Sequence, residues 1–145
     1  MSFGWINWIN TTAIVCLILI NIIAAQKGLS DSFSSKYMIV NLFEQVGRYG
    51  CIALMILPIF VENWKFGFES VVEMLFWVCL TILILVIYGL LWLKKANGGI
   101  GILYGLAIIP IILFLLNGIL LRHPALVVAS FAFGVFHLII VKENV

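Results

Sequence analysis

The chain has 145 residues, of which 65% are hydrophobic and only 10% are charged, and its net charge is +2. Soluble domains are about half apolar and about one quarter charged, so a soluble fold could not cover its surface with the polar groups of this sequence. The small net charge and the lack of a basic run exclude a nucleic-acid partner. The length allows one domain, and the composition predicts an all-α integral membrane protein.

Five apolar stretches are predicted to cross the lipid bilayer as a compact bundle. A crossing needs about 20 mostly apolar residues, because an α-helix rises ~1.5 Å per residue through a core ~30 Å thick. The predicted helices cover residues 5–26, 37–61, 70–93, 99–121 and 125–141. The connecting loops are short, so any binding site has to lie among the helices.

The second predicted helix carries a polar stripe. Four polar residues follow the spacing i, i+3, i+4 and i+7, which places them on one helical face: Asn41, Glu44, Gln45 and Arg48. Glu44 and Arg48 are spaced for an ion pair. Arg48 is predicted to lie ~16 Å from the start of the helix, near the bilayer centre, where an arginine costs about 2.5–3.5 kcal/mol. The stripe therefore has to face other helices, a cavity or a partner.

Small residues recur at helix-packing spacing in the second, fourth and fifth predicted helices. The pattern includes Gly101 and Gly105, Gly47 and Gly50 around Arg48, and Ala125/Ala129 with Ser130/Gly134. Such spacing lets helix backbones approach closely, so these helices are predicted to pack tightly or to form a homo-oligomer through these faces. Pro58 and Pro110 are predicted to lie inside the second and fourth helices and to kink them.

The fifth predicted helix is the shortest, with 17 residues. Arg122, His123 and Pro124 precede it and combine a charge with a helix breaker, so they predict a tight turn before a fifth crossing. The alternative is four crossings followed by a re-entrant or interfacial C-terminal helix. His137 stands alone on this apolar stretch, which is more typical of a core or interfacial histidine than of a metal ligand.

The distribution of basic residues predicts the orientation. One side of the membrane would hold five lysines, Lys27, Lys36, Lys94, Lys95 and Lys142, and the other would hold Lys65 and Arg122 in its loops. Because cytoplasmic loops are enriched in Lys and Arg, the N-terminus is predicted outside and the C-terminus in the cytoplasm, in the plasma (or bacterial inner) membrane.

Matching depths along the predicted helices places further polar residues in one layer with the stripe. Asn21, Tyr88, Tyr104 and His137 lie in the same half of the bilayer as Glu44 and Arg48 on this topology. We hypothesise that this layer forms the ligand-binding site, because ionisable residues inside membranes are usually functional. The alternative is that these residues only hold the bundle together, at about 0.6 kcal/mol per interhelical hydrogen bond.

Other chemistry-bearing residues show no catalytic or metal-binding pattern, and no cofactor is predicted. Cys16, Cys51 and Cys79 each lie in an apolar stretch without a C-x-x-C spacing. Near the outer end, Glu62, Glu69 and Glu73 surround Lys65 and are interpreted as a solvated rim. The motifs of serine hydrolases and zinc peptidases are absent from the sequence.

The leading functional hypothesis is a small membrane protein that binds or transports an amphipathic or anionic small molecule, or a lipid, at the Glu44/Arg48 site. One alternative is an accessory or immunity-type subunit whose polar stripe docks a partner helix. Another is a membrane enzyme acting on lipid, with Glu44 or His137 as general base. With no catalytic motif, the enzyme is the less favoured hypothesis.

Overall fold

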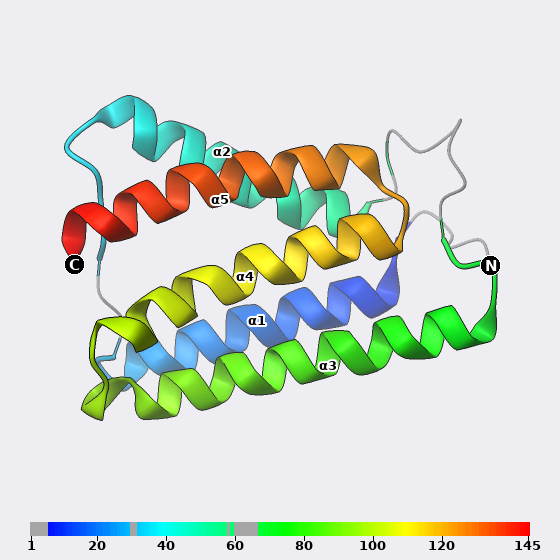
Figure 1. Ribbon diagram of the computed structural model, residues 1–145, viewed down its shortest axis with the longest axis horizontal. Coiled ribbons are helices and arrows are strands. Elements are labelled where there is room, and N and C mark those ends of the chain that lie inside the picture. Colours follow the sequence, from blue (N-terminus) through cyan, green and yellow to red (C-terminus); the bar gives the residue numbers. More distant parts are fainter. Residues whose placement is uncertain (1–5, 30–31, 58, 60–66) are drawn as a thin grey trace.

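The structure, a computed structural model, describes residues 6–29, 32–57, 59 and 67–145. Over these residues it contains no strand, and successive α-helices run antiparallel (Figure 1). The helices are α1 (Trp8–Gln26), α2 (Met38–Ile56), α3 (Val71–Lys94) with the short 3-10 turn η1 (Lys95–Asn97), α4 (Ile100–Leu120) and α5 (Pro124–Asn144). The predicted all-α fold with five helices is confirmed.

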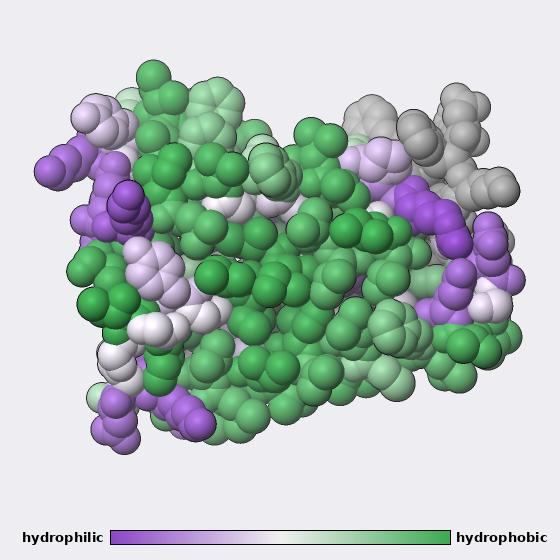
Figure 2. Space-filling model, viewed as in Figure 1, coloured by the Kyte–Doolittle hydropathy of each residue, from purple (hydrophilic) through white to green (hydrophobic). Residues whose placement is uncertain are grey.

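Four of these helices, α1, α3, α4 and α5, are long and apolar enough to span a bilayer, within the part of the chain that is described. At ~1.5 Å per residue, their 19 to 24 residues span roughly 30 Å. Figure 2 shows the matching surface, an apolar band between two ends where hydrophilic residues gather. The chain is therefore a multi-pass membrane protein.

The helix that is not apolar enough to count as a candidate span is α2, and not α5 as the sequence had indicated. α5 has 21 residues, because it begins at Pro124 and continues to Asn144 beyond the predicted end. This length removes the reason for a re-entrant C-terminal helix. α2 has 19 residues, but its polar stripe lowers its hydropathy, and it is not among the spanning candidates.

Helix ends follow local side-chain chemistry. The side chains of Asn7 and Ser70 accept hydrogen bonds from the backbone N–H groups of Asn10 and Glu73, which caps the N-termini of α1 and α3. His123 caps α5, where Pro124 occupies the first turn and sacrifices no helical hydrogen bond. Arg122 has a φ of +54°, which reverses the chain between α4 and α5. The predicted tight turn is therefore confirmed.

The prediction for the end of the second helix is wrong. α2 ends at Ile56, and Leu57 is extended, with φ −105° and ψ 118°. A residue that precedes proline is driven out of the helical region by the proline ring, so the helix stops before Pro58 and is not kinked by it. Pro58 itself lies outside the described residues. Pro110, in contrast, lies inside α4 as predicted.

The packing of α5 between α2 and α4 forms the main part of the core. Glycines allow this approach: a Cβ added to Gly47 would lie 3.0 Å from the Cα of Phe133, and one added to Gly134 would lie 2.9 Å from the Ile111 side chain. The predicted tight packing is confirmed where α5 meets α2 and α4, whereas a Cβ added to Gly105 would meet Leu91 on α3 and one added to Gly101 would meet no atom within 4 Å. On the other side of the bundle, α1 packs against α3 and against α2.

Candidate ligand site on the second helix

The predicted ion pair between Glu44 and Arg48 is present on α2. The Arg48 Nε donates to Glu44 Oε1 at 3.1 Å, and Nη2 pairs with the same oxygen. The two side chains differ greatly in exposure, since Glu44 is 4% exposed and Arg48 is 45% exposed. The carboxylate is therefore enclosed by the bundle, whereas part of the Arg48 side chain faces outward.

His137 on α5 completes a cluster of three ionisable residues. Its Nδ1 lies 2.8 Å from Glu44 Oε1, and its ring stacks on Phe133 with 4.9 Å between the ring centroids. An ionised carboxylate can only accept hydrogen bonds, so Nδ1 carries the proton while Glu44 is charged. One buried oxygen thus receives donors from two helices, and we call Glu44, Arg48 and His137 the ionisable cluster.

The register of the α2–α5 contact explains why these residues meet. The rings of Phe43 and Phe136 stack 5.1 Å apart beside the cluster. One helical turn beyond Glu44, Gly47 packs on the Phe133 backbone, as described above. Further along the same face, the Cys51 thiol lies within hydrogen-bonding reach of Ser130. Close contact along this seam holds His137 against Glu44.

A second polar pair joins α1 to α3. The Tyr88 hydroxyl donates to Asn21 Oδ1 at 2.7 Å, and the Asn21 amide nitrogen donates to the Leu17 carbonyl at 2.8 Å. Tyr88 is buried, so this pair of hydrogen bonds links α1 to α3 inside the bundle.

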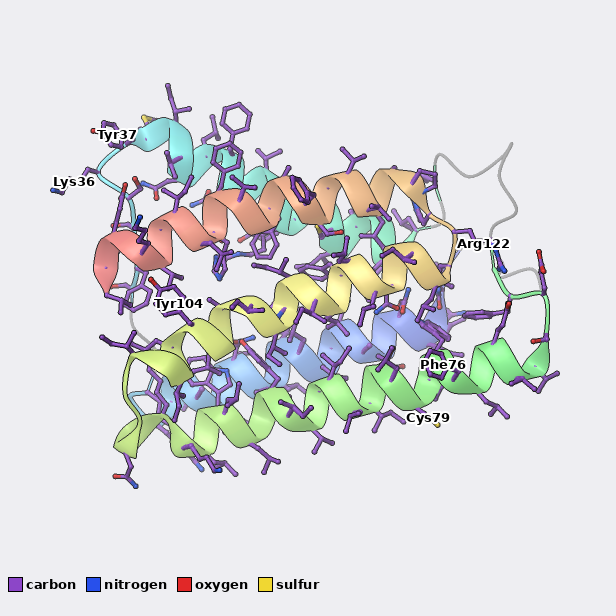
Figure 3. The ribbon with its side chains drawn as sticks, viewed as in Figure 1. Lys36, Tyr37, Phe76, Cys79, Tyr104 and Arg122 are labelled. Carbon is purple, nitrogen blue, oxygen red and sulfur yellow. The ribbon has the colours of Figure 1, made fainter. Side chains whose placement is uncertain are left out.

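The three other residues of the predicted site lie elsewhere. The Asn41 side chain accepts from the Ser35 N–H at 2.8 Å and donates to the Ser35 carbonyl at 2.9 Å, which fixes the loop before α2. Gln45 is exposed. Tyr104 is half-buried on α4, at the end of the bundle that also holds Tyr37 (Figure 3), and its hydroxyl makes no hydrogen bond with another described residue.

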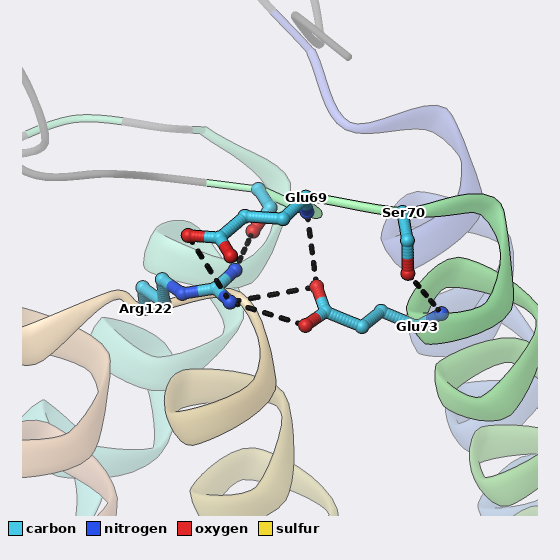
Figure 4. Close-up of polar contacts among 5 residues, drawn as sticks. Glu69, Ser70, Glu73 and Arg122 are labelled. Carbon is cyan, nitrogen blue, oxygen red and sulfur yellow. Dashed lines mark hydrogen bonds and ion pairs between the residues drawn. The ribbon is translucent and has the colours of Figure 1, made fainter.

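The acidic residues at the opposite end are not simply a solvated rim. Arg122 donates to the Gly67 carbonyl at 2.5 Å and to both Glu73 carboxylate oxygens at 3.3 and 3.4 Å, and it lies 3.8 Å from Glu69 Oε1 (Figure 4). This clasp ties the α4–α5 turn to the start of α3. Beside it lies a hollow of about 150 Å³, lined partly by Phe68 and Phe76. Glu62 and Lys65 lie outside the described residues.

Two buried polar contacts were not expected from the sequence. The Trp77 indole N–H donates to Asn117 Oδ1 at 2.6 Å, linking α3 to α4, and the Asn10 amide donates to the Met55 carbonyl at 3.2 Å, linking α1 to the end of α2. Asparagines in apolar helices could have indicated such links. Both contacts are buried away from the ionisable cluster, and they hold helices together.

The described part of the chain contains no metal site and no disulfide. Within the described ranges, no three side chains of His, Cys, Asp or Glu are arranged to hold a metal ion. Cys16, Cys51 and Cys79 are free thiols, and the exposed Cys79 projects from the outer face of α3 (Figure 3). Comparison of the chain with protein-family models, curated proteins and solved structures found no match. Function therefore has to be inferred from the chain itself.

Proposed function

We propose that the chain is a membrane-embedded protein that binds or transports an amphipathic molecule with an anionic head group, and that the ionisable cluster is its site. The observation that carries the proposal is the 45% exposure of Arg48, whose partner Glu44 is only 4% exposed. Arg48 is ten residues into α2, or ~15 Å along the helix. A partly exposed arginine side chain at that position along the helix favours an anionic partner, because lipid tails cannot solvate a guanidinium.

The chemistry of the cluster fits this ligand class. A guanidinium has five N–H donors, and the contacts with Glu44 use two of them. The remaining donors can form the paired hydrogen bonds that arginine makes with carboxylate or phosphate groups. Glu44 would orient Arg48, and His137 would hold Glu44. The apolar surface of α2 beside Arg48, including Val46 and Tyr49, would contact the ligand's hydrocarbon tail.

The same reasoning extends to location. The C-terminus lies at the end of the bundle where α1 connects to α2 and α3 to α4 (Figure 1), so all five lysines of the predicted cytoplasmic side belong to that end. This asymmetry supports a plasma-membrane protein with its C-terminus in the cytoplasm. The ligand would reach the cluster from the lipid or from the cytoplasmic side.

A binding titration tests the proposal. The purified protein, in nanodiscs of phosphatidylcholine, would be titrated with dodecyl phosphate and, separately, with zwitterionic dodecylphosphocholine. We expect saturable binding of dodecyl phosphate only, and its loss in Arg48→Met and Glu44→Gln. The control Lys36→Gln removes a cation just before α2 and should bind as the unchanged chain does. Equal binding by Arg48→Met and the unchanged chain would overturn the proposal.

A partner helix is the second candidate occupant. It is favoured by Gln45, which is exposed one residue after Glu44 and could donate to another helix. In this case Arg48→Met would disrupt a co-purifying complex, and dodecyl phosphate would not bind the unchanged chain. Self-association is a related proposal. A Cβ added to Gly50 or Gly101 would meet no atom within 4 Å, so the space beside these glycines is open to a helix of a second copy. The enzyme hypothesis has the least support, because Glu44 is already engaged by two donors.

A further inference from the structure

An apolar groove lies between α1 and α3, near the lysine-rich end of the bundle. Its volume is about 270 Å³. Six of the residues that form its walls are apolar side chains: Ile20, Ile23 and Ala24 on α1, and Val86, Leu90 and Leu93 on α3. Gly89 lines the groove and leaves it open because it has no side chain. A Cβ added to Gly89 would come near only the Ile20 side chain, at 4.0 Å.

The groove has one basic side chain among its described lining residues, Lys27, which directly follows α1. The Lys95 ammonium group bonds to the Leu29 carbonyl and lies 5.0 Å from the centre of the Trp92 ring, and both Leu29 and Trp92 line the groove. No acidic side chain is among the described residues that line it. The groove thus combines an apolar channel with a cationic entrance.

We infer that this groove binds one acyl chain of an anionic phospholipid, whose phosphate lies beside Lys27. The charge of the entrance selects an anionic over a zwitterionic head group, since each Lys near an anionic lipid surface adds attraction. The apolar walls accept a chain segment and not the polar part of the molecule. The groove shares no lining residue with the ionisable cluster, so the inference is independent of the proposed function.

Native mass spectrometry in equal amounts of phosphatidylglycerol and phosphatidylcholine with the same acyl chains tests this inference. We expect the unchanged chain to retain phosphatidylglycerol selectively. Lys27→Gln should lower the ratio of the two retained lipids about fivefold. The Lys27 side chain makes no hydrogen bond with another described residue, so this variant should keep the fold, which circular dichroism checks. Gly89→Leu, which fills the groove, should lower retention of both lipids.

A matched control separates this site from general surface charge. Lys142→Gln removes a lysine at the same end of the bundle but on α5, and it should retain phosphatidylglycerol as the unchanged chain does. To separate the groove from the ionisable cluster, Lys27→Gln is also made in an Arg48→Met background, where it should still lower the lipid ratio. The inference fails if Lys27→Gln keeps the original lipid ratio, or if Lys142→Gln lowers the ratio as much as Lys27→Gln does.

Discussion

Replacing Gly47 with alanine tests the seam that holds His137 against Glu44. A Cβ on Gly47 would lie 3.0 Å from both the Cα and Cβ of Phe133 and 3.2 Å from its backbone nitrogen. These atoms belong to the backbone of α5 or are attached directly to it, so a side-chain rotation cannot relieve the clash. Alanine at this position therefore has to push α2 away from α5.

Gly50 provides a matched control three residues later on the same helix. A Cβ there meets nothing within 4 Å. Alanine is favoured over glycine inside a helix by about 0.8–1.0 kcal/mol, and both variants receive this gain. The difference between their free energies of unfolding therefore isolates the cost of overpacking, about 1–3 kcal/mol. We expect Gly50→Ala to be neutral or stabilising and Gly47→Ala to be destabilising.

Two assays measure this difference. Unfolding by increasing dodecyl sulfate in mixed micelles would give the free energies. Maleimide labelling, with mass spectrometry to locate the label, would report separation of the helices, because Cys51 is fully buried in the α2–α5 contact whereas Cys79 is exposed and serves as reference. Equal unfolding of the two alanine variants, with Cys51 equally protected in both, would refute the reasoning.

Three further predictions concern contacts outside this seam. Tyr88→Phe loses the hydrogen bond to Asn21 and should cost about 0.6 kcal/mol in the same unfolding assay. Burial lowers the pKa of His123 in the folded chain, so near and below the ordinary histidine pKa of about 6.5 the unfolded chain binds more protons than the folded one. The stability of the protein should therefore fall as pH drops through that value. His123→Asn, which keeps an N-cap acceptor, should flatten this pH dependence. Arg122→Gln should lower stability only slightly, since Glu73 is 43% exposed, and a loss as large as that of Gly47→Ala would show that the clasp is more than a surface ion pair.

Much of the fold and part of the site could be predicted because helical spacing decides which residues share a face. The i,i+4 spacing of Glu44 and Arg48 was sufficient to predict their pairing, and matching depth was sufficient to select His137 as a neighbour. Depth does not determine how a helix is rotated about its axis. For that reason Tyr104 was expected in the polar layer, although the structure shows it half-buried on α4 without a hydrogen bond to that layer.

Other differences arise where hydropathy and backbone geometry disagree. The apolar run continues past Ile56, so hydropathy extended the second helix to residue 61, whereas the conformational restriction before Pro58 ends it earlier. Arg122 was counted only as a loop cation, because sequence spacing cannot show that its guanidinium meets Glu73, 49 residues away. Contacts between distant segments depend on how helices pack, which local patterns do not encode.

The proximity of Arg48 to a bound anionic head group is the most direct test of the proposed function. The sequence contains only two arginines, Arg48 and Arg122. Arg122→Lys in ¹⁵N-arginine-labelled protein therefore leaves one guanidinium signal, from Arg48. With dodecyl phosphate bound in phosphatidylcholine nanodiscs whose phosphorus signal is resolved from that of the probe, solid-state NMR would measure the ¹⁵N–³¹P coupling. We predict coupling between the Arg48 guanidinium and the dodecyl phosphate phosphorus; a saturated sample without such coupling would contradict the proposed site.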